Sequence, residues 1–163
     1  EFIHEQTNSD ALVEEYIEGR ELYIGVIGNE RLTTYPLWEL DFGTLPVAMA
    51  GIATRKVKWD LKYQRKHGIN TGPAKDLPEG LPARMAALAR RIYRALLMTG
   101  YARIDVRLKP DGSVYVLEAN ANPNLEKEED FAISAQAGGV GYERLLERIM
   151  RSGMGYEAAW RQT

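Results

Sequence analysis

The fold of this protein is decided by one stretch of its sequence, which reads Arg103-Ile104-Asp105-Val106-Arg107-Leu108 and, after Pro110-Asp111-Gly112, Val114-Tyr115-Val116-Leu117-Glu118-Ala119-Asn120. Apolar and polar residues alternate in the first run, which predicts a strand with one face toward a core. Pro-Asp-Gly is typical of a turn between strands. The stretch therefore predicts a β-hairpin, with strands at 102–108 and 114–120 around a loop at 110–113.

The polar residues of this hairpin predict a cation site. With a four-residue loop, Asp105 lies directly opposite Glu118, and Arg103 lies opposite Asn120. Two carboxylates in that arrangement repel each other unless a cation lies between them. Mg²⁺ typically binds one or two carboxylates together with substrate phosphates, and Asn120, expected on the same face as Val116 and Glu118, adds a neutral oxygen. The alternative is an exposed hairpin whose alternating polar residues face water.

Three strands are predicted before the hairpin, at 12–17, 20–27 and 31–38, and short turns between them favour an antiparallel meander. The segment 41–81 is different, because glycine and proline interrupt any long periodicity and a cation-rich run occupies 55–66. Long irregular loops are uncommon in compact domains and are often functional. We therefore expect an irregular, functional loop in this segment.

Helices are predicted on both sides of the hairpin. Pro82 and Gly100 suit the start and the stop of a helix over 82–99. Its expected apolar stripe is Met85, Leu88, Ile92 and Leu96. Two shorter helices are expected at 130–137 and 142–150. The expected buried face of the last one is Leu145, Leu146, Ile149 and Met150.

Composition excludes several classes of protein. The chain has 163 residues with 21 Lys and Arg against 23 Asp and Glu, and this balance argues against a nucleic-acid-binding protein. No apolar run approaches the roughly 20 residues that span a membrane. The absence of cysteine excludes disulfides, thiolate zinc sites and a cysteine nucleophile, and it fits a cytoplasmic location.

The hairpin closely resembles the metal-binding signature of the ATP-grasp superfamily, with the D-alanine–D-alanine ligase group as the closest branch. The resemblance rests on Arg103-Ile104-Asp105, the Pro-Asp-Gly turn and Leu117-Glu118-Ala119-Asn120-Ala121-Asn122-Pro123. It implies that Asp105, Glu118 and Asn120 hold Mg²⁺ ions, or Mn²⁺, that bridge the ATP phosphates. It implies that Arg103 acts catalytically by stabilising the reacting acyl phosphate. The implied fold is α+β, an antiparallel sheet with helices packed on one face.

A second resemblance lies near the start, where the run from Val13 to Leu22 is similar to the segment that joins the two ATP-grasp lobes. It implies that Glu14 accepts a hydrogen bond from the adenine amino group and that the backbone of Tyr16 and Ile17 binds the ring edge. It also implies that Glu21 binds the ribose hydroxyls. Carboxylates suit these roles because they accept hydrogen bonds from N–H and O–H groups. The alternative is a run of solvated charges.

The cation-rich run offers a lysine for the phosphates. In the family a lysine of this region reaches over them, and Lys62 is the candidate here, with Arg55 and Lys58 as alternates. A cationic loop of this kind closes over a charged nucleotide and excludes water. The alternative is a solvated basic loop.

The resemblance implies residues 11–152 as an ATP-grasp C-terminal lobe, residues 1–10 as a segment from a preceding lobe, and 153–163 as a tail. It implies an ATP-dependent carboxylate–amine ligase that acts through an acyl phosphate. Its partners would be ATP, small-molecule carboxylate and amine substrates, and the missing N-terminal lobe of the same polypeptide, without which we expect no activity. We expect no nucleic-acid or membrane partner, and a homo-oligomer stays open. The rival hypothesis is a non-catalytic nucleotide-binding or regulatory module with this fold.

One departure from the ligase pattern follows Pro123. The dipeptide ligases carry glycine and then a serine-rich, acceptor-binding stretch, whereas this chain reads Asn124-Leu125-Glu126-Lys127-Glu128-Glu129-Asp130. The negative charge predicts selection of a cationic acceptor. The alternative is that these acidic residues cap the helix that begins near Asp130.

Overall fold

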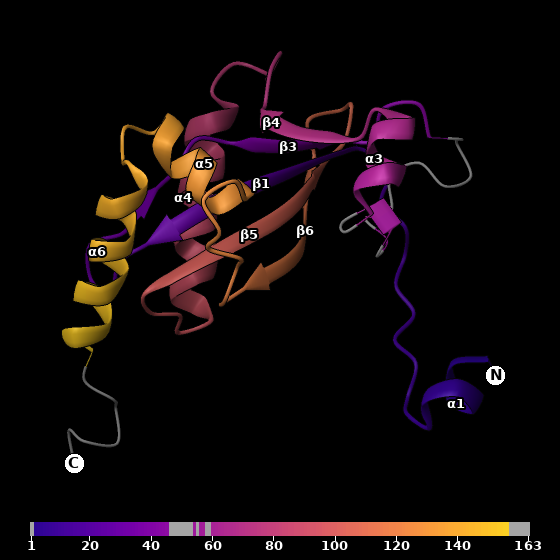
Figure 1. Cartoon of the computed structure of the whole chain (residues 1–163), viewed down its shortest axis with the longest axis horizontal. Coiled ribbons are helices and arrows are strands. Elements are labelled where there is room, and N and C mark those ends of the chain that lie inside the picture. The colour runs from indigo at the N-terminus through magenta and orange to yellow at the C-terminus, as the bar shows by residue number, and fades with distance from the viewer. Residues whose placement is uncertain (1, 46–53, 55, 58–59, 157–163) are drawn as a thin grey trace.

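A six-stranded antiparallel sheet forms the centre of the computed structural model, which describes residues 2–45, 54, 56–57 and 60–156 (Figure 1). The strands are β1 (Arg20–Ile27), β2 (Thr33–Thr34), β3 (Trp38–Asp41), β4 (Asn70–Pro73), β5 (Tyr101–Leu108) and β6 (Val114–Asn120). Their order in the sheet is β4-β3-β1-β5-β6, and the short β2 pairs with β1. The predicted hairpin is therefore confirmed as β5 and β6, at one edge of the sheet.

Strand β1 is buried along almost its whole length because helices cover the sheet on both sides. On one face, Leu22, Ile24 and Val26 pack against helix α4 (Leu81–Ala95). The buried residues of α4 are Leu81, Met85, Ala89 and Tyr93. The expected stripe shares only Met85 with this set, and Leu96 is 56% exposed because the helix ends before it.

The opposite face carries helix α5 (Asp130–Ala137), which packs with α6 (Tyr142–Met154). Phe131 of α5 lies so close to Gly25 of β1 that a Cβ on this glycine would meet the ring at 3.1 Å. The α+β class and the antiparallel sheet are thus confirmed. The expectation that helices pack on one face is wrong, because α4 and α5 lie on opposite faces. In α6, Leu145 is buried as expected, but Met150 is 66% exposed.

The segment expected to be irregular contains regular structure. Helix α3 (Leu61–His67) begins where Asp60 Oδ1 accepts hydrogen bonds from the backbone N–H groups of Lys62 and Tyr63, both at 3.0 Å. It ends at Gly68, whose φ of 67° favours glycine. Strand β4 follows directly. Asp60 before the helix and Gly68 after it were the sequence signals for α3. They were missed because the helix is short and glycine and proline are frequent in the surrounding segment.

The N-terminal part differs from the predicted meander. Helix α1 (Phe2–Thr7) and the chain that follows it project away from the sheet (Figure 1). Residues 12–17 form no strand, and Leu12 and Val13 are 81% and 89% exposed. The strand predicted at 31–38 is only the short β2, followed by β3 from Trp38. Among the described residues no strand pairs with 12–17, so this run stays outside the sheet.

None of the helices in the described parts of the chain is long and apolar enough to cross a membrane.

Candidate active site

One face of the sheet carries a row of buried charged side chains. Because side chains alternate between the two faces of a strand, Glu21 of β1 and Asp105 and Arg107 of β5 lie on the face opposite α4. They are 5%, 3% and 4% exposed, respectively. Burial of a charged group is costly unless the group is paired. The partners of these three side chains therefore determine which of their atoms can bind a ligand.

Arg103 and Asp105, two residues apart on β5, form a bidentate ion pair. Arg103 Nε donates to Asp105 Oδ1 and Nη2 donates to Oδ2, both at 2.8 Å. The guanidinium also lies over the ring of Tyr23, 4.4 Å from its centroid. Its third nitrogen, Nη1, faces Asp130 Oδ2 of α5 at 3.9 Å. The predicted catalytic arginine is thus held at the junction of β1, β5 and α5.

The pKa values of this pair reflect burial and charge together. Burial alone would lower the pKa of Arg103, but the hydrogen bond and charge of Asp105 outweigh it, so that this pKa is raised. Burial raises the pKa of Asp105, and Arg103 opposes that rise. The charges of Glu118 and Glu21 raise the pKa of Asp105 further. The pKa of Asp105 is therefore raised mainly because the carboxyl group is buried, in spite of its ion pair with Arg103.

The cross-strand pairs that the sequence predicts are present. Asp105 pairs with Glu118, and Arg103 with Asn120. At the tip of the hairpin, Leu108 pairs with Val114, which is one residue away from the predicted register. A β-bulge between Asp105 and Val106 then shifts the pairing by one residue and restores the predicted partners. Val116 pairs with Val106, on the α4 face, so the expectation that it shares a face with Glu118 is wrong.

These residues fit a hard divalent cation. Asp105 and Glu118 supply carboxylates from opposite strands, and Asn120 supplies an amide oxygen that now accepts from the Asn122 N–H at 2.9 Å. No group of three or more His, Cys, Asp or Glu that could hold a metal occurs among the described residues. A two-carboxylate set suits Mg²⁺, which fills its remaining positions with water and phosphate oxygens. The structure therefore brings together the three predicted ligands, with Asp105 occupied by Arg103.

Glu21, the predicted ribose ligand, is held by two donors. Arg107 Nη2 donates to Glu21 Oε2 and the Tyr23 hydroxyl donates to Oε1, both at 2.8 Å. Burial and the nearby Glu21 charge raise the pKa of Tyr23, so its hydroxyl stays a donor. The carboxylate is therefore fixed in orientation at the start of β1.

Sequence reasoning missed Arg107. Its guanidinium donates to the Gly19 carbonyl at 2.9 Å and lies 5.8 Å and 5.6 Å from the ring centroids of Tyr16 and Phe42. It thus ties the chain before β1 to the charged face. The signal was available, since Arg107 follows Asp105 by two residues and must share its face.

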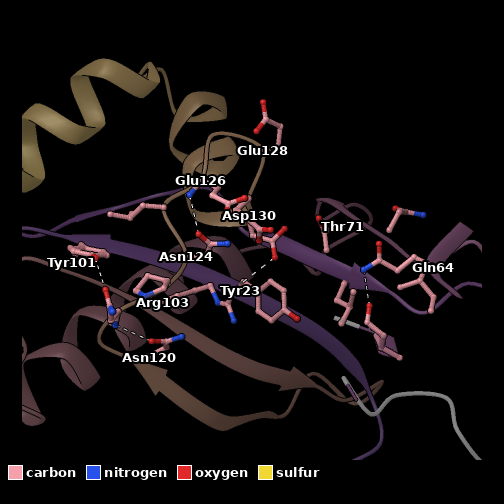
Figure 2. Close-up of a pocket in the computed structure, with 18 residues that line it drawn as sticks. Tyr23, Gln64, Thr71, Tyr101, Arg103, Asn120, Asn124, Glu126, Glu128 and Asp130 are labelled. Atoms are coloured by element: carbon pink, nitrogen blue, oxygen red, sulfur yellow. Dashed lines mark hydrogen bonds and ion pairs between the residues drawn. The ribbon is translucent and has the colours of Figure 1, made fainter. Parts of the chain in front are cut away.

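A cavity of about 1030 Å³ opens beside Arg103. Figure 2 shows Arg103 and Tyr23 together, with Asp130, Glu126 and Asn124 on one side and Thr71 and Gln64 on the other. The same cavity is lined by Asn120 and by Glu128 and Glu129. The acidic segment therefore shares this cavity with Arg103 and Asn120, whereas Asp105 and Glu118 are not among the lining residues.

The acidic segment does not cap α5 as the alternative reading required. Glu129 is the N-cap residue, and its side chain makes no capping hydrogen bond. Burial raises the pKa of Glu129, as do the charges of Asp130 and Glu126, whereas Arg103 lowers it. Only the favourable interaction of Asp130 with the helix dipole remains from the capping hypothesis.

The remaining predicted residues lie elsewhere. A second cavity of about 660 Å³ is lined by Tyr16, Gly19 and Phe42. Glu14 is exposed and lines neither of these two cavities in the described structure, and Ile17 is partly buried. Lys62 is exposed on the first turn of α3, outside both linings, whereas Gln64 of the same helix lines the larger one. Arg55 and Lys58 lie outside the described residues.

The sheet, its edge hairpin and the buried charged row define the C-terminal lobe of an ATP-grasp protein. Residues 3–151 match the family model described as D-ala D-ala ligase C-terminus, and the chain belongs to that family.

Relatives and solved structures agree with this assignment. The chain is 32% identical over 145 residues to protein y4sG of Sinorhizobium fredii, and 31% identical over 150 residues to a D-alanine–D-alanine ligase of Carboxydothermus hydrogenoformans. These matches cover 86% and 91% of the chain, but only 40% and 45% of the relatives. A Bacillus anthracis D-alanine–D-alanine ligase structure has 25% identity and a TM-score of 0.66, covering 86% of this chain and 41% of its own. A structure of that ligase with ATP has 24% identity and a TM-score of 0.64, over 86% and 40%. The chain thus spans less than half the length of these proteins.

Proposed function

We propose that this lobe binds ATP with Mg²⁺ and serves a carboxylate–amine ligase that works through an acyl phosphate. The observation that carries the proposal is the opposed pair Asp105 and Glu118, together with Arg103, which pairs with Asp105 and lines a cavity of about 1030 Å³. Membership of the D-ala D-ala ligase C-terminus family supports the reaction class. A cytosolic location belongs to the same proposal, because ATP is the proposed substrate.

In the proposed reaction, a substrate carboxylate oxygen takes the γ-phosphoryl group of ATP, and ADP leaves. The amine nitrogen then forms the amide bond, phosphate leaves and the amine loses a proton. Bound Mg²⁺, held by Asp105, Glu118 and Asn120, would neutralise phosphate charge. Arg103 contributes a fixed, buried guanidinium that donates hydrogen bonds where negative charge develops on the acyl phosphate. Tyr23 and Asp130 orient this guanidinium before substrate binds.

The nucleotide end of the site is assigned to the chain around β1. Glu21 is buried as a doubly hydrogen-bonded acceptor and suits the ribose hydroxyls. Tyr16 lines the second cavity, so we place adenine beside the backbone of Tyr16 and Ile17, with Glu14 as acceptor for its amino group. Lys62 is exposed at the start of α3, where a phosphate of bound ATP is its proposed partner.

The acceptor end is assigned to the acidic segment. Glu126, Glu128, Glu129 and Asp130 line the larger cavity, whereas Arg103, already paired with Asp105, is the one cation among its described lining residues. Such a field favours a cationic amine and disfavours an acceptor that carries a free carboxylate. We therefore propose that the acceptor carries net positive charge and differs from D-alanine.

A regulatory module that binds nucleotide without catalysis is the second candidate. It is favoured by the ion pair with Arg103, which occupies both oxygens of the proposed metal ligand Asp105. The chain also spans less than half the length of the relatives compared.

The complete reaction requires a preceding lobe, and the exposed Leu12 and Val13 offer that lobe an apolar contact.

Calorimetry with ADP and ATP tests the proposal on the 163-residue chain. We expect weak binding that requires Mg²⁺ and is lost in Glu118→Gln, with Glu143→Gln of α6 as the control. Binding that ignores Mg²⁺ would disprove the metal assignment.

Joining the chain to its N-terminal lobe should produce ligase turnover, whereas the isolated chain should hydrolyse no ATP. Retained nucleotide binding without turnover in the joined protein would favour the regulatory module.

A further inference from the structure

The proposed metal ligand Asp105 is bound by Arg103 in this structure. Both of its carboxylate oxygens accept hydrogen bonds at 2.8 Å, from the Nε and Nη2 edge of the guanidinium. Side-chain exposure is only 15% for Arg103 and 5% for Asp105, so water cannot readily replace either partner. A cation that binds Asp105 must therefore compete with Arg103.

Releasing Asp105 would leave Arg103 as a buried charge without its partner. Loss of one partner from a buried ion pair costs several kcal/mol. That cost would oppose metal binding unless another carboxylate replaced Asp105 at the guanidinium. The neighbouring side chains therefore decide whether Asp105 can bind a cation.

Asp130 is placed to replace it. Its Oδ2 lies 3.9 Å from Nη1 of Arg103, the nitrogen that does not contact Asp105, and its side chain is 13% exposed. The distance is longer than a hydrogen bond, so the contact is an incomplete one. The ring of Tyr23, 4.4 Å from the guanidinium carbon, supports the cation while its partner changes.

We propose that Asp130 is a positioning residue, which becomes the carboxylate partner of Arg103 when Asp105 binds a divalent cation. The proposal rests on the metal site of the proposed function. Arg103 then keeps a carboxylate partner in both states, and its cationic end is drawn toward the cavity that Asp130 lines. Metal loading and orientation of the catalytic arginine are thereby coupled through two carboxylates on β5 and α5.

The test uses the 163-residue chain with Mn²⁺ and ADP, and electron paramagnetic resonance counts the free Mn²⁺. Asp130→Asn should weaken Mn²⁺ binding about tenfold, which corresponds to about 1.4 kcal/mol. Glu143→Gln is the control, since Glu143 is an exposed acidic residue in the first turn of α6 and lines neither cavity. The control should bind Mn²⁺ within about twofold of the unmodified chain, a difference of about 0.4 kcal/mol.

A spectroscopic readout follows the arginine itself. With the diamagnetic Mg²⁺ and ADP, the Arg103 Nε–H signal in nitrogen-15 NMR should shift as the hydrogen bond to Asp105 is lost. In Asp130→Asn it should shift and also exchange faster with water. Asp130→Ser serves as a second variant if Asp130→Asn does not fold.

The Arg103→Met background separates the possible outcomes. There, Asp130→Asn should not change Mn²⁺ affinity, because no guanidinium remains to be transferred. An equal loss in both backgrounds would show that Asp130 acts on the ion directly and would overturn the transfer. If Arg103→Met binds Mn²⁺ but the unmodified chain does not, the transfer of Arg103 to Asp130 is overturned and the proposed metal site is supported. No binding in either would overturn the proposed metal site itself.

Discussion

Arg107 and Glu21 form an ion pair of 2.8 Å between β5 and β1, with side chains only 5% and 6% exposed. This pair lies directly across the two central strands. Arg107 also donates to the Gly19 carbonyl, so it connects the chain before β1 to the carboxylate of Glu21, the proposed ligand of the ribose hydroxyls. A buried pair of this kind contributes little net stability, but removing one partner is costly.

Arg107→Met should therefore lower the free energy of unfolding by about 3–5 kcal/mol, because Glu21 would stay buried without its cation. Urea denaturation measures this change. The double variant Arg107→Met, Glu21→Gln should recover much of the loss, since no unpaired charge remains. A loss below about 1 kcal/mol in the single variant would show that water reaches Glu21 and that the pair is not required.

Asp105→Asn and Glu118→Gln should change stability in opposite directions. The opposed carboxylates alone predict that either change relieves repulsion, by tenths to about 1 kcal/mol. The structure corrects this for Asp105, because its replacement deprives the buried Arg103 of its partner and should cost about 3–5 kcal/mol. Glu118 is exposed and only raises the pKa of Asp105, so Glu118→Gln should be neutral or stabilising.

Denaturation of both variants without metal tests this sign difference. In the joined protein, both should abolish ligase turnover, since each removes a proposed metal ligand. Near-normal turnover in Glu118→Gln would exclude Glu118 from the metal site.

Lys62→Met should weaken ATP binding without a change in melting temperature. Lys62 is exposed and its backbone, not its side chain, makes the contact with Asp60. Lys66→Met is the control, because Lys66 is also exposed but lies in the last turn of the same helix. Equal ATP affinities for the two variants would exclude Lys62 as the phosphate ligand.

Glu128→Gln with Glu129→Gln should raise the Michaelis constant for the amine substrate of the joined protein and leave that for ATP nearly unchanged. The reason is the loss of negative charge from the acceptor cavity. Arginine, putrescine and D-alanine, tested as acceptors, report whether positive charge is favoured. Unchanged kinetics for every acceptor, with a lower melting temperature, would restrict these residues to stabilising α5.

Stability should fall as the pH rises past the ordinary glutamate value because of Glu129. Its pKa in the folded protein is raised from 4.5 by burial and by Asp130 and Glu126. Between 4.5 and the raised value, the folded state holds a proton that the unfolded state has released, so stability decreases as pH increases through that window.

Urea midpoints measured across this range should therefore show a downward contribution that Glu129→Gln removes. Glu143→Gln, on the exposed side of α6, is the control and should retain it. The same slope in Glu129→Gln would assign the effect to other carboxyl groups.

Much of the fold follows from local patterns. The strand at 114–120 and the helix at 130–137 have the predicted bounds, because turn residues and glycines mark their ends. The predicted strand at 12–17 failed for a non-local reason: no strand of the described residues pairs with it. The buried stripe of α4 was predicted in part: Met85 is buried, and Leu88 and Ile92 pack partly buried against the core, but the sheet contacts are centred on a neighbouring row of the helix.

Strand alternation, a local property, is enough to place Arg103 and Asp105 on one face of β5, and the assumed loop length predicts Glu118 opposite Asp105. Only the tertiary structure decided how these groups are paired. The approach of Asp130 from α5 and the burial of Arg107 against Glu21 depend on elements distant in the chain, and strand alternation does not indicate the bulge that restores the register of the hairpin. Pairing of buried charges is set by packing in three dimensions, because only a low-dielectric environment makes one partner preferable to water.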